Sequence, residues 1–194
     1  MNKKILILGL ACIAPLTLVA CNKDNNNTTV EKIQEIDPKL SDAGPIDQEK
    51  KKDLNSEDSL GDVKYKISDA WHKTTKDNIN IYVLNDEEGS HIQVAKMELP
   101  KDVPEKDYLD VSDAFLDQFF KGSSSSPFLE KEVSGQKIHG KKGTIESNGS
   151  SVDAITYVLV KGNTMYRFTA MSHIKLSDED AEIFNKMVDS IELK

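Results

Sequence analysis

The clearest pattern of apolar positions lies in the C-terminal third of the chain. Two sets of apolar side chains alternate over residues 152–160, which predicts a strand: Val152, Ala154, Val158 and Val160 on one side, and Ile155, Tyr157 and Leu159 on the other. The turn sequences Asn148-Gly149 and Gly162-Asn163 join it to strands predicted at 138–146 and 165–171. Because both faces of the middle strand are apolar, we expect both faces of this sheet to be covered.

Alternation also predicts strands earlier in the chain, at residues 63–67, 79–83 and 91–99. In the third of these, the apolar phase moves from Ile92 and Val94 to Ala95 and Met97. A bulge inserts one extra residue and shifts the phase of a strand, so the pattern predicts a bulge near Val94.

Two amphipathic helices are predicted. Between residues 105 and 121, large apolar residues recur at spacings of three and four, namely Tyr108, Val111, Phe115 and Phe119. Gly122 and the serines at 123–126, followed by Pro127, predict a flexible connector. The last helix begins at Ser177, which has an acidic residue three positions later, and carries an apolar face of Phe184, Met187, Val188 and Ile191.

The predicted order is three strands, a helix, three strands and a helix, with a further short strand at 128–133 as an option. This order predicts an α+β fold, in which a mostly antiparallel sheet is covered by helices.

Three segments resemble the PsbP/Mog1-like superfamily: residues 65–71, which end at Trp71, residues 164–170, and residues 184–191. The resemblance implies an α/β/α sandwich that is used for binding, since members act as accessory subunits of large assemblies or as partners of a small GTPase. In the family a Pro closely precedes the Trp of the first turn, whereas Asp69-Ala70 stands here. No particular partner is carried over to this chain.

Residues 1–20 have the architecture of a signal peptide, with Lys3 and Lys4 followed by an apolar run of about 15 residues. That run is shorter than the roughly 20 residues that a membrane-spanning helix needs. Residues 18–21, Leu-Val-Ala-Cys, resemble the lipobox of bacterial lipoproteins. The resemblance implies cleavage between Ala20 and Cys21, and a lipid carrying acyl chains such as palmitate on Cys21. The alternative is an ordinary secreted protein with a cysteine at its cleavage site.

The chain is therefore predicted to have three parts: a signal peptide at 1–20, a lipidated Cys21 with a flexible polar tether at 21–60, and a globular domain at 61–194. The tether is rich in Asn, Asp, Glu and Lys and poor in large apolar residues. Residues 30–36 are compatible with a transient helical turn, to which we attach no function. We expect the protein on the outer face of the cell membrane, anchored by lipid.

Charge and cysteine content narrow the function classes. The net charge of −8 disfavours nucleic acid as a partner, because acidic surfaces repel phosphate backbones. Cys12 and Cys21 are the only cysteines of the sequence, so no disulfide links the predicted domain.

The sequence predicts no catalytic residue, metal site or cofactor. A lipidated Cys21 leaves no free thiol, and the serine run lacks the G-x-S-x-G pattern of a nucleophile elbow. The four histidines, His72, His91, His139 and His173, lack zinc-binding spacing, although a fold brings distant residues together. Carboxylates gather on one face of the first helix, at Asp110, Asp113 and Asp117 with Asp107 nearby, and we interpret them as its solvated side rather than a divalent-cation site.

Trp71 and Phe128 are the candidate binding residues, with the core as the alternative place for Trp71. Together these features favour a membrane-anchored, extracytoplasmic, non-enzymatic binding or accessory module with an envelope protein as its partner. The alternative is a cell-envelope hydrolase or a metal-dependent enzyme whose residues converge only in the fold.

Overall fold

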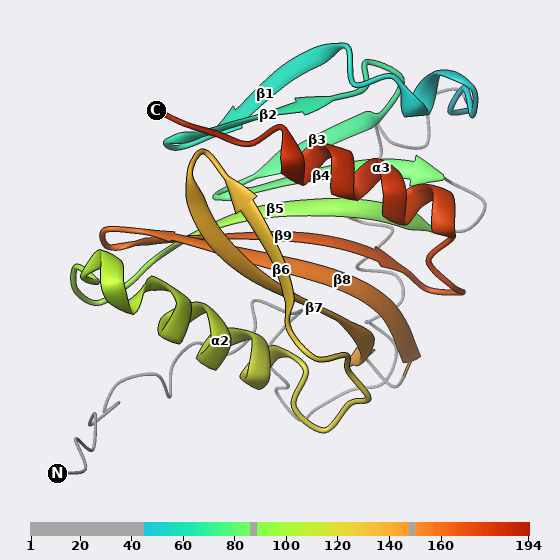
Figure 1. Ribbon diagram of the computed structural model, residues 1–194. Helices are drawn as coiled ribbons and strands as arrows, with labels where there is room; N and C mark the ends of the chain where they lie inside the picture. The colour runs from blue at the N-terminus through green and yellow to red at the C-terminus, as the bar shows by residue number, and fades with distance from the viewer. Residues whose placement is uncertain (1–44, 86–88, 148–149) are drawn as a thin grey trace, which may run out of the picture.

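The computed structural model describes residues 45–85, 89–147 and 150–194 (Figure 1). Its main element is an antiparallel seven-stranded sheet. From edge to edge the strands are β3 (His72–Lys76), β4 (Ile79–Asn85), β5 (Ser90–Glu98), β9 (Thr164–Ser172), β8 (Ser150–Lys161), β7 (Gln136–Ser147) and β6 (Leu129–Val133). A smaller antiparallel sheet contains β1 (Ser56–Leu60), β2 (Val63–Ile67) and β10 (Glu192–Leu193), with β2 in the middle.

The two predicted helices are present. The 3-10 turn η3 (Glu105–Asp107) leads into α2 (Tyr108–Phe119), which packs on β7 and β8. The second helix, α3 (Asp178–Asp189), contacts β2, β6 and β9. Its predicted N-cap is confirmed, because the Ser177 hydroxyl accepts a hydrogen bond of 3.1 Å from the backbone N–H of Asp180. The α+β prediction is thus confirmed, with the addition of a second small sheet.

Both faces of the large sheet are covered, as the alternation in residues 152–160 predicted. Ile155, Tyr157 and Leu159 pack with apolar residues of α3 and β2 in one core cluster. Val152, Ala154, Val158 and Val160 pack with Phe115 and Leu116 of α2 in another. Two helices on opposite faces therefore divide the core into two layers.

The predicted bulge near Val94 is wrong. β5 pairs with β9 without a break from His91 to Glu98, and the one register shift between β4 and β5 lies at Val83/Asn85. Ile92 and Val94 face the α3 cluster, whereas Met97 on the other face packs against the α2 cluster. The apolar positions change phase along β5 because both faces of this regular strand contact apolar partners, the α3 cluster on one face and the α2 cluster on the other.

The predicted boundary between tether and domain lies too late in the chain. Residues 45–60 are part of the fold: β1 pairs with β2, the side chain of Ile46 is buried, and so is that of Lys51 in the 3-10 turn η2 (Lys50–Lys52). The amino-acid composition did not predict that this segment is folded, because it contains few apolar residues. Polar contacts and the pairing of β1 with β2 hold it in place. The signal peptide, Ala20, Cys21 and the rest of the tether lie outside the described residues, as does the turn at 148–149.

β3 was also missed, because its sequence, His-Lys-Thr-Thr-Lys, has no apolar alternation. The optional strand at 128–133 is confirmed as β6. Within residues 45–85, 89–147 and 150–194, neither α2 nor α3 combines the length and the apolar character that crossing a bilayer requires.

Candidate functional site

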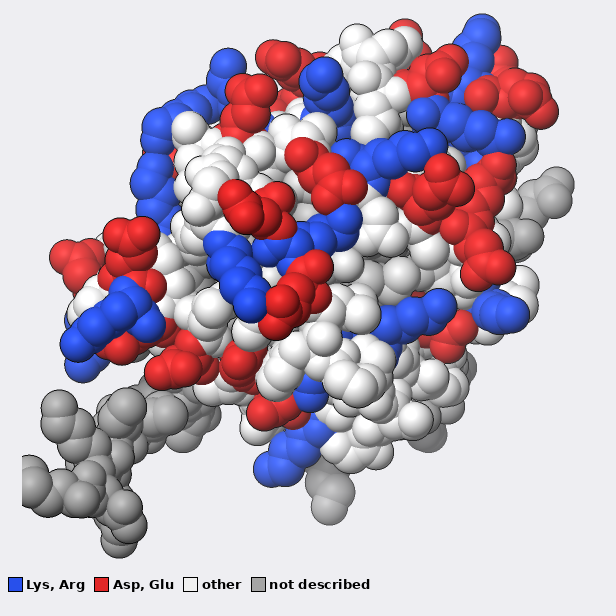
Figure 2. All heavy atoms as spheres, in the orientation of Figure 1, with Lys and Arg blue, Asp and Glu red and all other residues white. Residues whose placement is uncertain are grey.

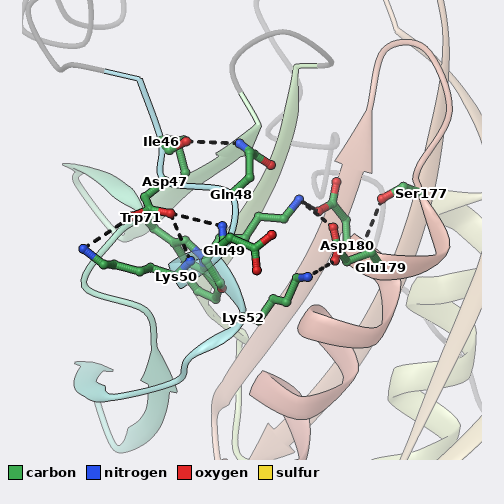
Figure 3. A network of polar contacts seen from close by, with 11 residues as sticks. Ile46, Asp47, Gln48, Glu49, Lys50, Lys52, Trp71, Ser177, Glu179 and Asp180 are labelled. Carbon is green, nitrogen blue, oxygen red and sulfur yellow. Dashed lines mark hydrogen bonds and ion pairs between the residues drawn. The ribbon is translucent and has the colours of Figure 1, made fainter.

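Trp71, the first candidate binding residue, is in the core. Its side chain is 6% exposed, and its ring lies 5.9 Å from that of Tyr82 between centroids. The indole Nε1–H donates a hydrogen bond of 3.0 Å to the backbone carbonyl of Lys51 (Figure 3). Trp71 therefore holds residues 45–52 against the domain and has no large surface to offer a partner.

The same segment is tied to the start of α3. The ammonium of Lys51 lies 2.9 Å from Asp180 Oδ1 and 3.2 Å from Glu179 Oε2, and Lys52 lies 2.8 Å from Glu179 (Figure 3). Burial alone lowers the pKa of Lys51, but the hydrogen bonds to Asp180 and Glu179 outweigh it and raise that pKa. We call these contacts the Lys51 clasp; they join two segments 129 residues apart in the sequence.

Phe128, the second candidate, is at the surface. It is 37% exposed and is one of two large apolar side chains exposed in the described part of the chain, the other being Ile174. The Phe128 ring stacks on the imidazole of His139, with 5.5 Å between centroids and 23° between planes. The ammonium of Lys141 lies 4.5 Å from the Phe128 centroid, within the range of a cation–π interaction.

Two carboxylates of α2 pair with the basic side chains that contact Phe128. His139 Nδ1 lies 2.6 Å from Asp113 Oδ1, and Lys141 Nζ lies 2.5 Å from Asp117 Oδ1. His139 and Lys141 are two residues apart on β7, so their side chains lie on the same face of the sheet, under α2. We name Phe128, His139, Lys141, Asp113 and Asp117 the Phe128 patch.

The chain before Phe128 is fixed to β7, not a flexible connector as predicted. Ser125 forms a bridge with Gly143, Ser126 N–H donates to the Lys142 carbonyl at 2.7 Å, and Thr144 N–H donates to the Ser124 carbonyl at 3.1 Å. A Cβ at Gly143 would lie 2.9 Å from Ser125 Cα, so this close approach requires glycine. The serines therefore extend the edge of the sheet and set the position of Phe128.

The acidic face of α2 is partly used in these contacts. Asp113 and Asp117 pair with basic groups of β7, whereas Asp110 is exposed. In the described ranges, no three His, Cys, Asp or Glu side chains come together as a metal site would require. Figure 2 shows acidic and basic side chains interspersed on the face that it presents, without a large area of one sign.

The Asp113–His139 pair has the geometry in which a carboxylate orients an imidazole for catalysis. Such a pair also needs a hydroxyl or thiol at the other nitrogen. Among the described residues His139 Nε2 has no hydrogen-bond partner, and the charged group near it is Glu130, at 3.7 Å. The contacts of His139 therefore link α2 to β7 and orient Phe128. Among the described residues, they do not include a nucleophile.

Two other histidines meet in the fold. The rings of His91 and His173 lie 6.3 Å apart between centroids, and His91 Nδ1 lies 3.0 Å from the Gly89 carbonyl. Burial lowers the pKa of His91, which favours the neutral imidazole. Two imidazoles are fewer than the three or four ligands of a zinc site.

Sequence analysis selected Phe128 but missed the side chains that hold it. His139 and Lys141 stand at i and i+2 of a predicted strand, which is the signal that places two side chains on one face. Their pairing with Asp113 and Asp117 depends on how α2 crosses β7, which the local pattern does not contain.

Solved structures similar to this chain share its fold. CyanoP, the cyanobacterial PsbP of Synechocystis sp. PCC 6803, matches with a TM-score of 0.51 at 11% identity, over 72% of this chain and 91% of its own. LpqN, involved in cell envelope biogenesis of Mycobacterium tuberculosis, matches with a TM-score of 0.50 at 13% identity, over 72% and 90%. At sequence identities this low, the two matches show that the chain has a PsbP-like fold and nothing beyond the fold.

The yeast Ran-binding protein Mog1p aligns with a TM-score of 0.47 at 12% identity, over 73% of this chain and 96% of its own. The chain spans about half (47%) of a similar protein of known structure from Bacteroides thetaiotaomicron, at 9% identity, over 71% of this chain and with a TM-score of 0.47. No protein-family model matches the sequence, and no curated protein matches it significantly.

Proposed function

We propose that the protein is a lipid-anchored extracytoplasmic accessory module that binds an envelope protein through the Phe128 patch. The observation that carries the binding role is Phe128 itself, a large aromatic side chain that is 37% exposed and yet held in one orientation by His139 and Lys141. Aromatic side chains that are fixed before binding lose little conformational entropy on association. Such residues are typical anchors of protein interfaces.

The proposed place of action rests on the N-terminal sequence. Leu18, Ala20 and Cys21 occupy the lipobox positions behind a basic start and an apolar run. A diacylglyceryl group on Cys21 would hold the protein to the membrane, since each buried CH₂ contributes about 0.8 kcal/mol. The similarity in fold to LpqN, a protein involved in cell envelope biogenesis, is compatible with work in the same compartment.

The anchor is tested by Cys21→Ala. Acyl labelling with a radioactive or alkyne-bearing fatty acid is expected on the native chain and absent from the variant, which should leave the membrane fraction or stay uncleaved. Cys12→Ala is the matched control and should keep the label. Acyl labelling that persists in Cys21→Ala would contradict the anchor.

The binding role is tested by a photoreactive phenylalanine analogue at position 128 in the native host. We expect a crosslinked product of one defined partner at position 128, and none at Ile174, which is also apolar and is more exposed at 74%. Phe128→Ala should lose the binding of that partner and fail to complement a deletion strain. Full complementation by a folded, membrane-bound Phe128→Ala variant would contradict the proposal.

The Asp113–His139 hydrogen bond is the observation on which an enzymatic alternative would rest, and one variant separates the two functions. His139→Phe keeps a ring for Phe128 to stack on but removes the imidazole nitrogens. A binding module should retain most of its activity, whereas an enzyme that uses His139 as a base should lose it by orders of magnitude. Asp110→Asn, on the exposed part of α2, serves as the control that both functions tolerate.

A further inference from the structure

Three charged side chains are buried in the described part of the chain, and one of them has no partner of opposite charge. Lys51 and Asp180 are buried against each other, with 2.9 Å between Lys51 Nζ and Asp180 Oδ1. Arg167 of β9 is 4% exposed, and no ion pair among the described residues includes it. A buried charge is costly unless a counter-charge or hydrogen bonds compensate for it.

The guanidinium of Arg167 uses few of its donors within the described ranges. Its Nη2 donates a hydrogen bond of 3.2 Å to Gln93 Oε1, its Nε has no hydrogen-bond partner there, and its central carbon lies 5.2 Å from the Phe119 ring centroid. Burial lowers the pKa of Arg167 to about 10, the direction expected for a buried cation without an acidic partner. The donors that remain match the two oxygens of a carboxylate.

The type of residue supports the same interpretation. Arg167 is the only arginine of the sequence, and all the others of its 25 Lys and Arg residues are lysines. Lysine is a flexible point charge, whereas the planar fork of arginine binds a carboxylate through two parallel hydrogen bonds. The one arginine therefore stands at the buried position where a ligand, and not the described chain, has to supply the negative charge.

An apolar stripe lies on the same face of the large sheet as Arg167. The stripe consists of three half-buried side chains of β4 that belong to neither core cluster, namely Ile79, Ile81 and Val83. Ile79 pairs with Ala95 of β5, Ala95 pairs with Arg167, and Arg167 pairs with Val158, which packs in the α2 cluster. Directly opposite residues of antiparallel strands point to the same side, so the stripe and Arg167 share the α2 side of the sheet.

The dimensions of this half of the face suit a small molecule. On this side α2 packs on β7 and β8, whereas β9, β5, β4 and β3 follow outward to the sheet edge. Two strand spacings of about 4.8 Å separate β9 from β4, and the stripe is about 13 Å long at about 3.3 Å per residue. One short aliphatic chain with a polar end therefore reaches both the stripe and Arg167.

Gln93 lies between the stripe and Arg167. It is half-buried and pairs with Ile81 of β4, its Oε1 accepts the hydrogen bond from Arg167, and its Nε2 lies 3.4 Å from His91 Nε2. Contacts of 3.2 and 3.4 Å are long for hydrogen bonds, and the amide oxygen is a neutral acceptor. A carboxylate oxygen at the same place forms a charge-assisted bond of about twice the strength. Gln93 is therefore the side chain that an acid would replace.

We propose that this face binds a small amphipathic carboxylic acid, whose carboxylate pairs with Arg167 in place of Gln93 Oε1 and whose aliphatic body lies along the β4 stripe. One carboxylate charge matches one guanidinium. A phosphate monoester carries up to about two negative charges near neutral pH, more than this site balances in a protein of net charge −8. The proposal requires neither the lipid anchor nor the Phe128 patch, so it is a second binding function.

Decanoate is the probe, because it joins one carboxylate to an unbranched aliphatic chain. It is titrated into isotope-labelled residues 22–194, which include every described residue. The amide signals of Ile81 and Gln93 should shift saturably, and that of Lys66, on the small sheet, should stay in place. Decanol, which has the chain without the carboxylate, should bind about tenfold or more weakly, since a hydrogen bond to a charged group is lost.

Two variants assign the carboxylate to its partner. Arg167→Met removes the cation at similar volume, and should weaken decanoate binding about tenfold or more while leaving decanol binding unchanged. Lys96→Met is the matched control, because it makes the same charge change on the opposite face of β5, and it should bind decanoate as the native chain does. Gln93→Ala should bind decanoate at least as tightly as the native chain, because the competing acceptor is gone.

One further variant keeps the test decisive if Arg167→Met does not fold. Ile81→Ser changes a half-buried side chain of the stripe and should weaken decanoate and decanol alike. Equal affinities of the native chain for decanoate and decanol would overturn the proposal, as would decanoate affinity that is unchanged in a folded Arg167→Met variant. The absence of saturable shifts at Ile81 and Gln93 up to the solubility limit of decanoate would overturn it as well.

Discussion

At the residue scale, the contacts that matter most join residues that are far apart in the sequence. Lys51 is buried although it is a lysine in a run of three, because its ammonium has two carboxylates within 3.2 Å. Asp180 is fully buried, and its backbone N–H donates the hydrogen bond to Ser177 that caps the N-terminus of α3. A buried ion pair is costly to break on one side, since the remaining charge stays in a poorly solvating environment.

We therefore expect Lys51→Met to lower the free energy of unfolding by about 3–5 kcal/mol, because it leaves Asp180 buried without its cation. Lys52→Met is the matched control and should cost less than about 1 kcal/mol, since Lys52 pairs with Glu179 at the exposed surface. Urea unfolding followed by circular dichroism measures both. Equal losses in the two variants would show that the Lys51 clasp is not the stabilising contact.

At the scale of elements, the edge of the large sheet depends on one close backbone approach. Residues 124–126 continue the edge beyond β6 by bonding to β7, and Gly143 makes room for them. Phe128 lies between this segment and β6, so its orientation depends on the same contacts.

Gly143→Ala should detach residues 124–126 from β7 and destabilise the fold by about 1–3 kcal/mol, as overpacking does. Hydrogen exchange should become faster at the Ser126 and Thr144 amides, while the β8–β9 amides stay protected. Lys142→Ala, the neighbour with an exposed side chain, is the control and should leave this pattern unchanged. Unchanged protection of Ser126 in Gly143→Ala would contradict the role given to this glycine.

At the scale of the whole molecule, buried phenols link the small sheet to the large one. Tyr65 of β2 and Tyr82 of β4 share a hydroxyl hydrogen bond of 2.8 Å, and Asp58 of β1 accepts from Tyr82 at 2.7 Å. Burial raises the pKa of Tyr65 to about 12, although its hydrogen bonds to Tyr82 and Asn80 act in the opposite direction. The ordinary tyrosine pKa of about 10 applies to the unfolded chain.

A group whose pKa is raised in the folded state contributes its stability below the unfolded pKa and loses it as pH rises through the folded value. The free energy of unfolding should therefore fall between about pH 10 and 12, by on the order of 3 kcal/mol from Tyr65 alone. The raised pKa of Lys51 acts in the same direction. Urea midpoints at pH 8 and pH 11.5 test this: the difference should be smaller in Tyr65→Phe, and an identical difference would refute the assignment.

The sequence by itself determined both helices, the strands that have apolar alternation, and the two-layer core. Periodicity is a local property, so the alternation in residues 152–160 predicted a strand with two covered faces, and spacings of three and four predicted both helices. The same local signal failed where a segment has few apolar residues. β1, β3 and the buried Lys51 are held by partners distant in the sequence, which no window of neighbouring residues contains.

Only the tertiary structure decided which side chains meet. It placed Trp71 in the core and left Phe128 exposed, although both are aromatic residues in predicted turns or connectors. It also paired Asp113 with His139 and left Arg167 without a carboxylate among the described residues. The physical reason is that burial and charge pairing depend on how strands and helices cross in space, while the sequence pattern specifies only which face of each element a side chain occupies.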